Sequence, residues 1–364
     1  MGDAQSNPTR AGTVDASFWR DRPVFLTGHT GFKGAWLSLW LQSMGARLTG
    51  FSLDVPTEPS LFELAKVAEG MEDVRGDVRD PETLNDAIAQ ARPEIVIHIA
   101  AQSLVRPSYS APQATYATNI MGTVNLLDAV RLHGGEVRAL VNVTSDKCYE
   151  NRELDRGYRE DEPMGGHDPY SSSKGASELV TSAYRRSFFT DDQGPRIASA
   201  RAGNVIGGGD WAEDRLLPDL MRAALAGEEV RIRNPNSTRP WQHVLSPLSG
   251  YLVLAQTLHE SASYAEGWNF GPADGDAKPV GWIVERIAEL WPGELAWSID
   301  EGPHPHEARY LKLDSAKAHE RLAWRPLLDL EQALAATVEW YGNHGEGADM
   351  QAVTLGQVAT LLRS

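Results

Sequence analysis

The sequence predicts an α/β protein: a doubly wound parallel sheet with a smaller, loop-rich substrate lobe toward the C-terminus. Two observations predict it. Short apolar runs alternate with helix-length segments, which is typical of right-handed β-α-β units. A glycine-rich turn, Gly28-x-x-Gly31-x-x-Gly34, follows the first apolar run and opens a helix-length segment, as in dinucleotide-binding (Rossmann) sheets.

The individual elements follow from local patterns. The runs at Val24–Thr27 and Ile95–Ile99 are almost continuously apolar, as expected of strands covered on both faces. One helix has clear start signals, because Asp80 can cap it and Pro81 fits its first turn. The expected strands are Val24–Thr27, Leu48–Leu53, Glu94–Ile99, Leu140–Thr144, Ile197–Ala200 and Trp268–Phe270, and the expected helices are Gly34–Met44, Pro81–Ala91, Gln113–Leu132 and Pro169–Phe188.

The composition and pattern of the chain change after Arg201. Glycine, proline and tryptophan become frequent there, and the helical patterns become shorter. We therefore expect a second lobe that is interrupted by a return to the large sheet. The predicted divisions are a disordered lead-in at 1–16, a dinucleotide-binding domain at 17–201 plus 240–271, a substrate lobe at 202–239 and 272–330, and C-terminal helices at 331–364.

Composition narrows the function. The 364 residues carry a net charge of −16, which disfavours nucleic acid and anionic membranes as partners. No apolar run approaches the ~20 residues of a membrane helix, and no metal site is expected. With a single cysteine, Cys148, no intrachain disulfide can form. This suits a reducing compartment, and we expect a cytoplasmic protein.

The glycine turn predicts a bound dinucleotide, because free N–H groups at a helix start can face a pyrophosphate. Asp54 lies 20 residues beyond Gly34, where a carboxylate accepts from ribose hydroxyls and repels a 2′-phosphate, which favours NAD over NADP. Lys33 could instead attract that phosphate, and Asp54 could be a solvated loop acid. Asp77 could hold the adenine amino group or be a plain strand-end residue. The predicted cofactor contacts are Gly28, Thr30, Gly31, Phe32, Lys33, Gly34, Asp54, Asp77, Val78, Ala100, Ala101, Gln102, Asn119, Tyr170 and Lys174.

A tyrosine-based proton shuttle is predicted beside this cofactor. Tyr170 and Lys174 are spaced i, i+4 and share a helix face. A nearby ammonium and an oxidised nicotinamide could lower the phenol's pKa from about 10, and Ser145 could bond the same substrate oxygen. Asp146 and Lys147 could transfer further protons, one or two carbons away. The plainer readings are a helix surface pair for Tyr170 and Lys174 and a loop ion pair for Asp146 and Lys147.

Five motifs carry a resemblance to a known family: GHTGFKG at 28–34, TSDKCY at 144–149, RAGNVIGGGDW at 201–211, RPWQHV at 239–244 and HPHEA at 304–308. Together they resemble the extended short-chain dehydrogenase/reductase family, and within it the nucleotide-sugar 4,6-dehydratases that act on CDP-glucose. The resemblance runs from about Phe25 to about Pro326.

The resemblance implies bound NAD and a three-step reaction. Tyr170 takes the proton of the 4-hydroxyl while carbon 4 is oxidised, water is eliminated across carbons 5 and 6 with Asp146 as the acid, and hydride returns to carbon 6. The product is a 4-keto-6-deoxy sugar. The implied substrate-binding residues are Ser103, Asn204, Arg215, Leu217, Arg239, His306 and Arg309. Trp211 and Trp241 are expected to pack on the nucleotide, with filling of the small lobe as the alternative.

The sequence departs from the dTDP-glucose branch at Lys147, where that branch places a glutamate as the carbon-5 base. The Asp-Lys pair resembles the CDP-glucose branch, but the base stays open, because an ordinary ammonium is protonated at neutral pH. Two other functions also stay open, a nucleotide-sugar 4-epimerase and a non-catalytic NAD-sensing binder. By the same resemblance the helices at Gln113–Leu132 and Pro169–Phe188 should form a homodimer, or part of a tetramer.

Overall fold

The computed structural model describes residues 12–190, 194–300, 302 and 311–362. Its centre is a seven-stranded, wholly parallel sheet of order β11-β6-β5-β4-β1-β2-β3, which confirms the predicted fold class. The strands are β1 (Pro23–Thr27), β2 (Arg47–Ser52), β3 (Glu72–Arg75), β4 (Ile95–His98), β5 (Ala139–Val143), β6 (Arg196–Arg201) and β11 (Gly267–Asn269).

The order of the strands reverses between β1 and β4. The chain runs outward from β1 through β2 and β3, then crosses back to place β4 on the other side of β1. Such a reversal leaves a crevice at the carboxyl ends of the two central strands, where doubly wound sheets bind their ligands.

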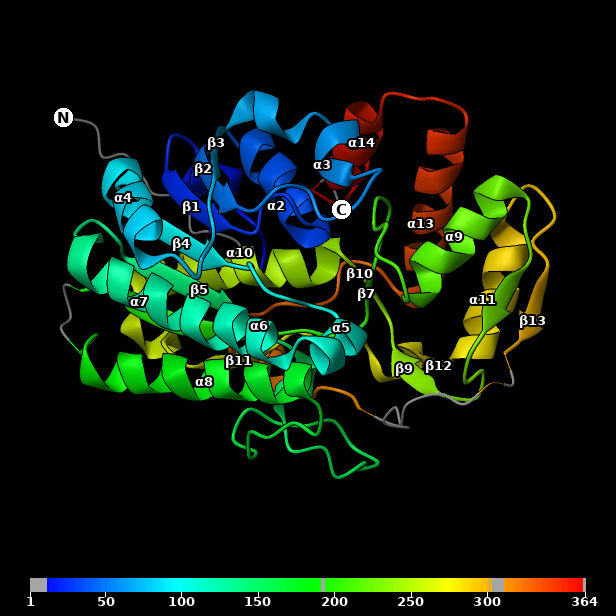
Figure 1. Ribbon diagram of the computed structural model, residues 1–364. Helices are drawn as coiled ribbons and strands as arrows, with labels where there is room; N and C mark the ends of the chain where they lie inside the picture. Colours follow the sequence, from blue (N-terminus) through cyan, green and yellow to red (C-terminus); the bar gives the residue numbers. More distant parts are fainter. Residues whose placement is uncertain (1–11, 191–193, 301, 303–310, 363–364) are drawn as a thin grey trace.

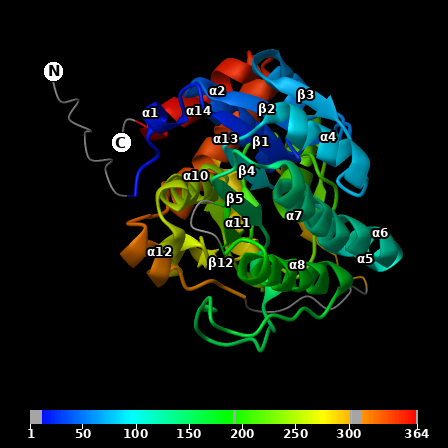
Figure 2. The same ribbon diagram turned by 90° about the vertical axis from the view of Figure 1, so that its left-hand side faces the viewer.

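Helices cover both faces of the sheet (Figures 1 and 2). Along β1, Val24 and Leu26 enter the core shared with α2 and α10, whereas Phe25 enters the opposite core with α4 and α7. This alternation explains why the strands read as continuous apolar runs. The covering helices are α2 (Phe32–Ser43) and α10 (Leu245–Glu260) on one face, and α4 (Pro81–Ala91), α7 (Gly122–His133) and α8 (Pro169–Ser187) on the other.

The second lobe is built from short strand pairs and helices. The pairs are β7 (Val205–Ile206) with β10 (Gln242–His243), β8 (Val230–Ile232) with β13 (Trp297–Ile299), and β9 (Thr238–Pro240) with β12 (Ala277–Pro279). Its helices are α9 (Leu216–Ala226) and α11 (Val280–Leu290), both packed on α13 (Leu330–Gly345), while α14 (Met350–Leu362) packs on α2.

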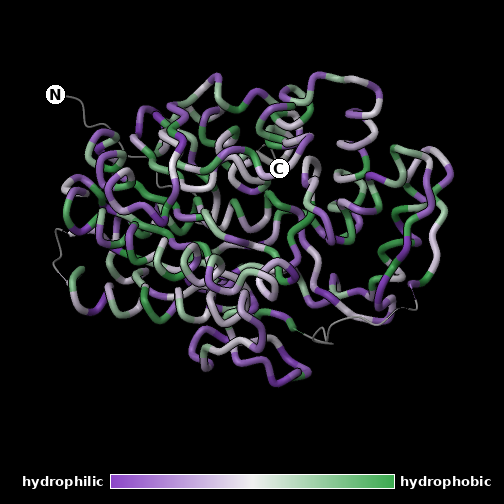
Figure 3. The backbone as a smooth tube through the Cα atoms, in the orientation of Figure 1, coloured by the Kyte–Doolittle hydropathy of each residue, from purple (hydrophilic) through white to green (hydrophobic). Residues whose placement is uncertain are grey.

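Shorter helical segments connect these elements. They are α1 (Ala16–Trp19), α3 (Leu61–Leu64), η1 (Val67–Gly70), α5 (Val105–Ser110), α6 (Pro112–Tyr116), η2 (Ala117–Met121), η3 (Asp146–Cys148), η4 (Ala262–Tyr264), η5 (Asp274–Asp276) and α12 (Ala316–Arg321). Hydrophobic segments concentrate in the sheet and its covering helices, and hydrophilic ones in the peripheral loops (Figure 3).

Two sequence expectations differ in detail from the structure. The helix expected at Gln113–Leu132 is interrupted by a π-helical turn, η2. Ordered chain also begins ahead of residue 17, within the predicted lead-in, because Thr13 and Asp15 both bond the side chain of Gln256 on α10. In the described ranges no helix has both the length and the apolar character needed to cross a membrane.

Candidate active site

A cavity of about 840 Å³ lies at the carboxyl ends of the central strands and continues under the second lobe. Eight lysines and arginines and eight aspartates and glutamates line it. The cavity is therefore balanced in charge within a chain of net charge −16. Polar groups that converge in one large concave site are the usual mark of a small-molecule binding site.

The glycine turn at the end of β1 forms a cradle that larger residues would fill. Gly28 has a φ of +81°, and a Cβ there would lie 2.7 Å from the backbone nitrogen of Ala100. A Cβ on Gly34 would lie 2.0 Å from the carbonyl oxygen of Gly28. The start of α2 can therefore pack directly against the turn, which leaves its backbone accessible to a pyrophosphate. The cradle fits a dinucleotide.

Two acidic residues line the end of the cavity beyond the glycine turn. The side chain of Asp54 is 93% exposed, and its nearest cation is Arg75 at 3.4 Å. Asp77 is held by Arg79, which lowers the pKa of its carboxyl group. Thr30, Val78, Ala100 and Ala101, which are also predicted cofactor contacts, line the cavity as well.

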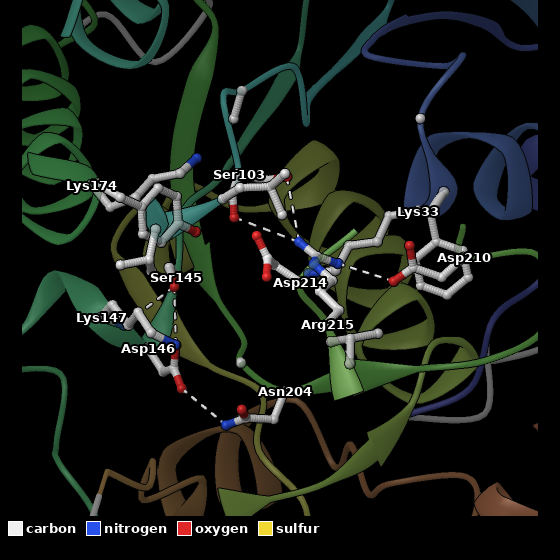
Figure 4. Close-up of a pocket in the computed structure, with 18 of the residues that line it drawn as sticks. Lys33, Ser103, Ser145, Asp146, Lys147, Lys174, Asn204, Asp210, Asp214 and Arg215 are labelled. Carbon is white, nitrogen blue, oxygen red and sulfur yellow. Dashed lines mark hydrogen bonds and ion pairs between the residues drawn. The ribbon is translucent and has the colours of Figure 1, made fainter. Parts of the chain in front are cut away.

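The predicted acid lies in a tight turn directly after β5. The hydroxyl of Ser145 donates to Asp146 Oδ1 at 2.9 Å, and Lys147 Nζ lies 4.0 Å from the same oxygen (Figure 4). The carboxylate of Asp146 is buried, and Asn204 Nδ2 donates to its other oxygen at 3.5 Å. A Cβ on Gly203 would fall 1.8 Å from Asp146 Oδ2, so glycine at 203 makes room for this carboxylate.

Tyr170 and Lys174 lie on α8, whose first turn is capped by Asp168. Burial raises the pKa of Tyr170 to about 12, against the opposing effect of a hydrogen bond with Ser145. Burial lowers the pKa of Lys174 to about 8, and its ammonium donates to the carbonyl of Val143 at 3.3 Å. The predicted fall in the pKa of Tyr170 is therefore not produced by the chain alone.

A buried ion pair lies behind the catalytic turn. Glu178 and Arg201 meet at 2.9 Å, both almost fully buried. Burial alone would raise the pKa of Glu178, but Arg201 and hydrogen bonds from Ser199 and Thr144 bring it to about 2. Thr144 immediately precedes Ser145, and Arg201 also donates to the hydroxyl of Tyr149 at 2.5 Å. Both ends of the turn are thus tied to one ion pair.

Two predicted cofactor contacts, Gln102 and Asn119, are not among the residues that line the cavity. Asn119 lies in the π-helical turn, where its amide oxygen accepts from the backbone N–H of Gln102 and its amide nitrogen donates to Ser173 on α8. The Gln102 side chain bonds the backbone of Leu104. The Asn119 amide therefore joins the segment after β4 to α8, whereas the Gln102 amide orders only its own turn.

The predicted substrate residues Ser103, Asn204, Arg215, Leu217 and Arg239 all line the cavity. Arg215 reaches across it, donating to Asp210 at 3.0 Å and to the hydroxyl of Ser103 at 3.4 Å (Figure 4). His306 and Arg309 lie outside the described residues.

The two tryptophans expected at the nucleotide, Trp211 and Trp241, lie in different surroundings. Trp241 lines the cavity. The indole of Trp211 packs instead on Trp340, Tyr341 and His344 of α13, so it belongs to the core of the second lobe. The expectation that Trp211 stacks on a nucleotide is wrong.

Lys33 lies at the catalytic end of the cavity. Burial lowers its pKa to about 8, and the neighbouring charges that act on it are Arg215, Lys174, Asp146 and Asp210. Figure 4 shows its side chain beside Arg215. Lys33 is thus positioned for the reacting end of a ligand, which removes the reason for expecting it at a ribose 2′-phosphate.

Sequence reasoning missed several charged residues of this site. Asp210 falls within the motif at 201–211, and Glu178 lies four residues after Lys174 on the same helix face. The sequence therefore offered a way to find both residues. Arg106 and Asp214 had none, because only the fold brings them together across the cavity.

The family model of the GDP-mannose 4,6-dehydratases matches residues 25–337. The chain belongs to this family. One relative, a CDP-glucose 4,6-dehydratase of Salmonella typhimurium strain LT2, is 56% identical over 93% of this chain and 95% of its own. A dTDP-glucose 4,6-dehydratase of Streptomyces griseus is 30% identical over 74% of this chain and 77% of its own.

Solved structures share the fold of this dehydratase family. A UDP-glucose 4-epimerase from Stenotrophomonas maltophila with bound NAD superimposes with a TM-score of 0.78 at 21% identity, covering 90% of this chain and all of its own. A dTDP-glucose 4,6-dehydratase from Bacillus anthracis in complex with NAD gives a TM-score of 0.73 at 23% identity, covering 91% of this chain and 99% of its own.

Proposed function

We propose that this chain is an NAD-dependent 4,6-dehydratase that converts CDP-glucose to CDP-4-keto-6-deoxyglucose and water. One observation carries the proposal: Ser145, Asp146, Lys147, Tyr170 and Lys174 line a single cavity together with the glycine cradle. The identity to a CDP-glucose 4,6-dehydratase along nearly the whole chain supports the choice of substrate.

The residues present fit NAD. Gly28, Gly31 and Gly34 would hold its pyrophosphate at the start of α2, and the exposed carboxylate of Asp54 would accept from the adenosine ribose. Bound in this way, NAD would supply the hydride acceptor for carbon 4 of the sugar and the hydride that carbon 6 receives. Its positive charge in the oxidised form would also favour ionisation of a nearby phenol.

Tyr170 acts first, as the base for the 4-hydroxyl. Its pKa of about 12 in the chain alone means that ionisation at neutral pH needs added positive charge nearby. Lys174 lies one helical turn further along α8, and its pKa of about 8 leaves it mostly protonated at neutral pH. Ser145 bonds Tyr170 and orients the proton path.

Asp146 and Lys147 serve the elimination. Once carbon 4 is a ketone, the hydrogen on carbon 5 becomes acidic and the 6-hydroxyl can leave with a proton. Asp146 is buried and held in place by Ser145 and Asn204. In its protonated form it would give its proton to the leaving 6-hydroxyl, and the carboxylate left behind would accept hydrogen bonds from Ser145 and Asn204. Lys147 Nζ lies 4.0 Å from Asp146, so it would stand beside the same part of the sugar. It would have to lose its own proton before it could take the one on carbon 5, so the carbon-5 base is either Lys147 or another group or water beside it.

The test is to incubate the protein with NAD and CDP-glucose, dTDP-glucose or GDP-mannose in turn, and to weigh the products. We expect the CDP-glucose product to be lighter by one water. A product of unchanged mass would support a 4-epimerase, and tight NAD binding without conversion of any sugar would support a non-catalytic binder.

We also propose that the chain is a homodimer. Six of the eight large apolar side chains exposed in the described chain belong to neighbouring helical segments along α5 to α8. Helices α7 and α8 lie side by side in Figure 1 and are in contact. Packing this face against a second copy would form a four-helix bundle, which buries these side chains symmetrically. They are Tyr109, Tyr116, Met121, Leu132, Leu179 and Phe188.

A further inference from the structure

One carboxylate joins two arginines from opposite sides of the cavity. Asp214 Oδ1 lies 2.8 Å from Nη1 of Arg106 and 3.2 Å from Nη2 of Arg233. Arg106 is on α5, next to α8 in the large domain, whereas Arg233 directly follows β8 in the second lobe. All three residues line the cavity. We call this three-residue contact the Asp214 clasp.

The backbone holds the Asp214 carboxylate inside the cavity. Asp214 has a φ of +61°, a left-handed conformation that aspartate adopts more readily than most non-glycine residues. In Figure 4 its carboxylate points into the cavity, between Arg215 and the turn at Ser145 and Asp146. The next residue, Arg215, already reaches across the cavity to Ser103. A negative group thus stands among three guanidinium groups.

We propose that Asp214 is an internal counter-anion, which holds Arg106 and Arg233 in place and releases them to the diphosphate of the incoming nucleotide sugar. Without it, Arg106, Arg215 and Arg233 would repel one another in one cavity. This proposal rests on the proposed function, which identifies the ligand as a nucleotide sugar.

The two arginines can exchange the Asp214 carboxylate for a ligand, because all three side chains of the clasp are partly exposed. Half-exposed ion pairs contribute little net free energy. A diphosphate offers more negative charge than a carboxylate, and its oxygens match the forked donors of arginine. Exchange would therefore favour a diphosphate over a monophosphate, and it would draw α5 and the second lobe onto the same ligand.

The experiment measures binding of CDP by isothermal titration calorimetry, with UDP as a second diphosphate. Asp214→Asn should tighten both nucleotides about fivefold, since it removes two competing partly exposed ion pairs. Arg106→Gln should weaken both by a similar factor. In the Arg106→Gln background, the gain from Asp214→Asn should fall to less than about twofold, because the two residues act on one another.

Glu136→Gln is the matched control, because Glu136 pairs with Arg92 as an exposed ion pair outside the cavity. It should leave CDP binding unchanged. The clasp is overturned if Asp214→Asn leaves CDP affinity unchanged or weakens it, or if its gain survives undiminished in the Arg106→Gln background. CDP binding needs no turnover. If Asp214→Asn binds CDP more tightly but the parent protein dehydrates no sugar, the proposed function is rejected and the clasp is kept. If the parent dehydrates CDP-glucose but Asp214→Asn leaves CDP affinity unchanged, the clasp is rejected and the proposed function is kept.

Discussion

At the scale of single residues, burial governs the proton chemistry. It raises the pKa of Tyr170 to about 12 and lowers that of Lys174 to about 8, so each group is moved away from its charged form. The motif Tyr-x-x-x-Lys was readable from sequence because its spacing of four residues fixes a shared helix face. The direction of the pKa shift was not readable, because desolvation depends on every segment packed around the side chain.

Replacing Tyr170 by Phe should remove the base for the 4-hydroxyl while keeping the ring in its packing. Loss of a general base typically slows a reaction by about 10²–10⁴-fold. We expect conversion of CDP-glucose to fall by that factor while CDP binding is retained. Transfer of deuterium from carbon 4 to carbon 6 of labelled substrate gives a direct readout, and transfer at the parent rate would exclude Tyr170 from the mechanism.

Replacing Lys147 by Met should affect the elimination and spare the oxidation, because Met keeps the length of the side chain without its amine. The side chain of Lys147 is 35% exposed, so the fold should tolerate the change. If removal of the carbon-5 proton becomes rate-limiting, the isotope effect of deuterium at carbon 5 should rise and that at carbon 4 should fall. Unaltered isotope effects at both carbons would argue that another group is the base.

At the scale of elements, α8 carries its functional residues one turn apart. Tyr170, Lys174 and Glu178 follow at intervals of four residues and are all buried. The first two face the cavity, while Glu178 holds Thr144 and Arg201 behind the catalytic turn. The helix therefore positions the base on α8 and the acid after β5 relative to one another. The sequence predicted this helix well, but it offered no reason to connect Glu178 with Arg201.

Replacing Glu178 by Gln should destabilise the fold, because Arg201 would stay buried without a negative partner. Breaking a buried ion pair on one side typically costs about 3–5 kcal/mol. We expect a loss of that order in the free energy of unfolding at pH 7, measured by urea denaturation. Glu136→Gln, at an exposed ion pair, is again the control and should change it by less than about 1 kcal/mol.

The same variant gives a pH test. The pKa of Glu178 is about 2 in the folded chain and 4.5 by reference, so its ionised form favours the folded state. That stabilisation is complete above about pH 4.5 and is lost as the pH falls toward 2. The difference in unfolding free energy between parent and Glu178→Gln should therefore shrink over this interval. A difference that stays constant down to pH 2 would contradict a depressed pKa.

At the scale of the whole molecule, the parallel sheet covered on both faces was predictable, because alternation and apolar runs depend on local sequence. The edge strand β3 (Glu72–Arg75) has no apolar run and was not among the expected strands. The cavity walls were predictable only in part. The glycine turn, the turn at Ser145 to Lys147 and Arg215 come from recognisable motifs, whereas Arg106 and Asp214 meet only because α5 and the second lobe fold over one cavity. Contacts between domains have no periodic signature in a single sequence. The cytoplasmic location stays a prediction.

The proposed dimer makes the last prediction. The side chain of Leu179 on α8 is 62% exposed, and in a symmetric dimer a substitution there acts in both subunits. Leu179→Glu would place two carboxylates in the apolar bundle, which should weaken the dimer by more than about tenfold. Sedimentation velocity should then show a smaller species than the parent.

Ile299→Glu is the matched control, since Ile299 is similarly exposed but lies on β13 in the second lobe. It should sediment like the parent. The described cavity residues from the glycine turn to Arg239 all come from one chain, so the Leu179→Glu species should still bind CDP. If Leu179→Glu and parent sediment alike as dimers, the interface lies elsewhere. If both sediment as monomers, the exposed face of α7 and α8 needs another explanation.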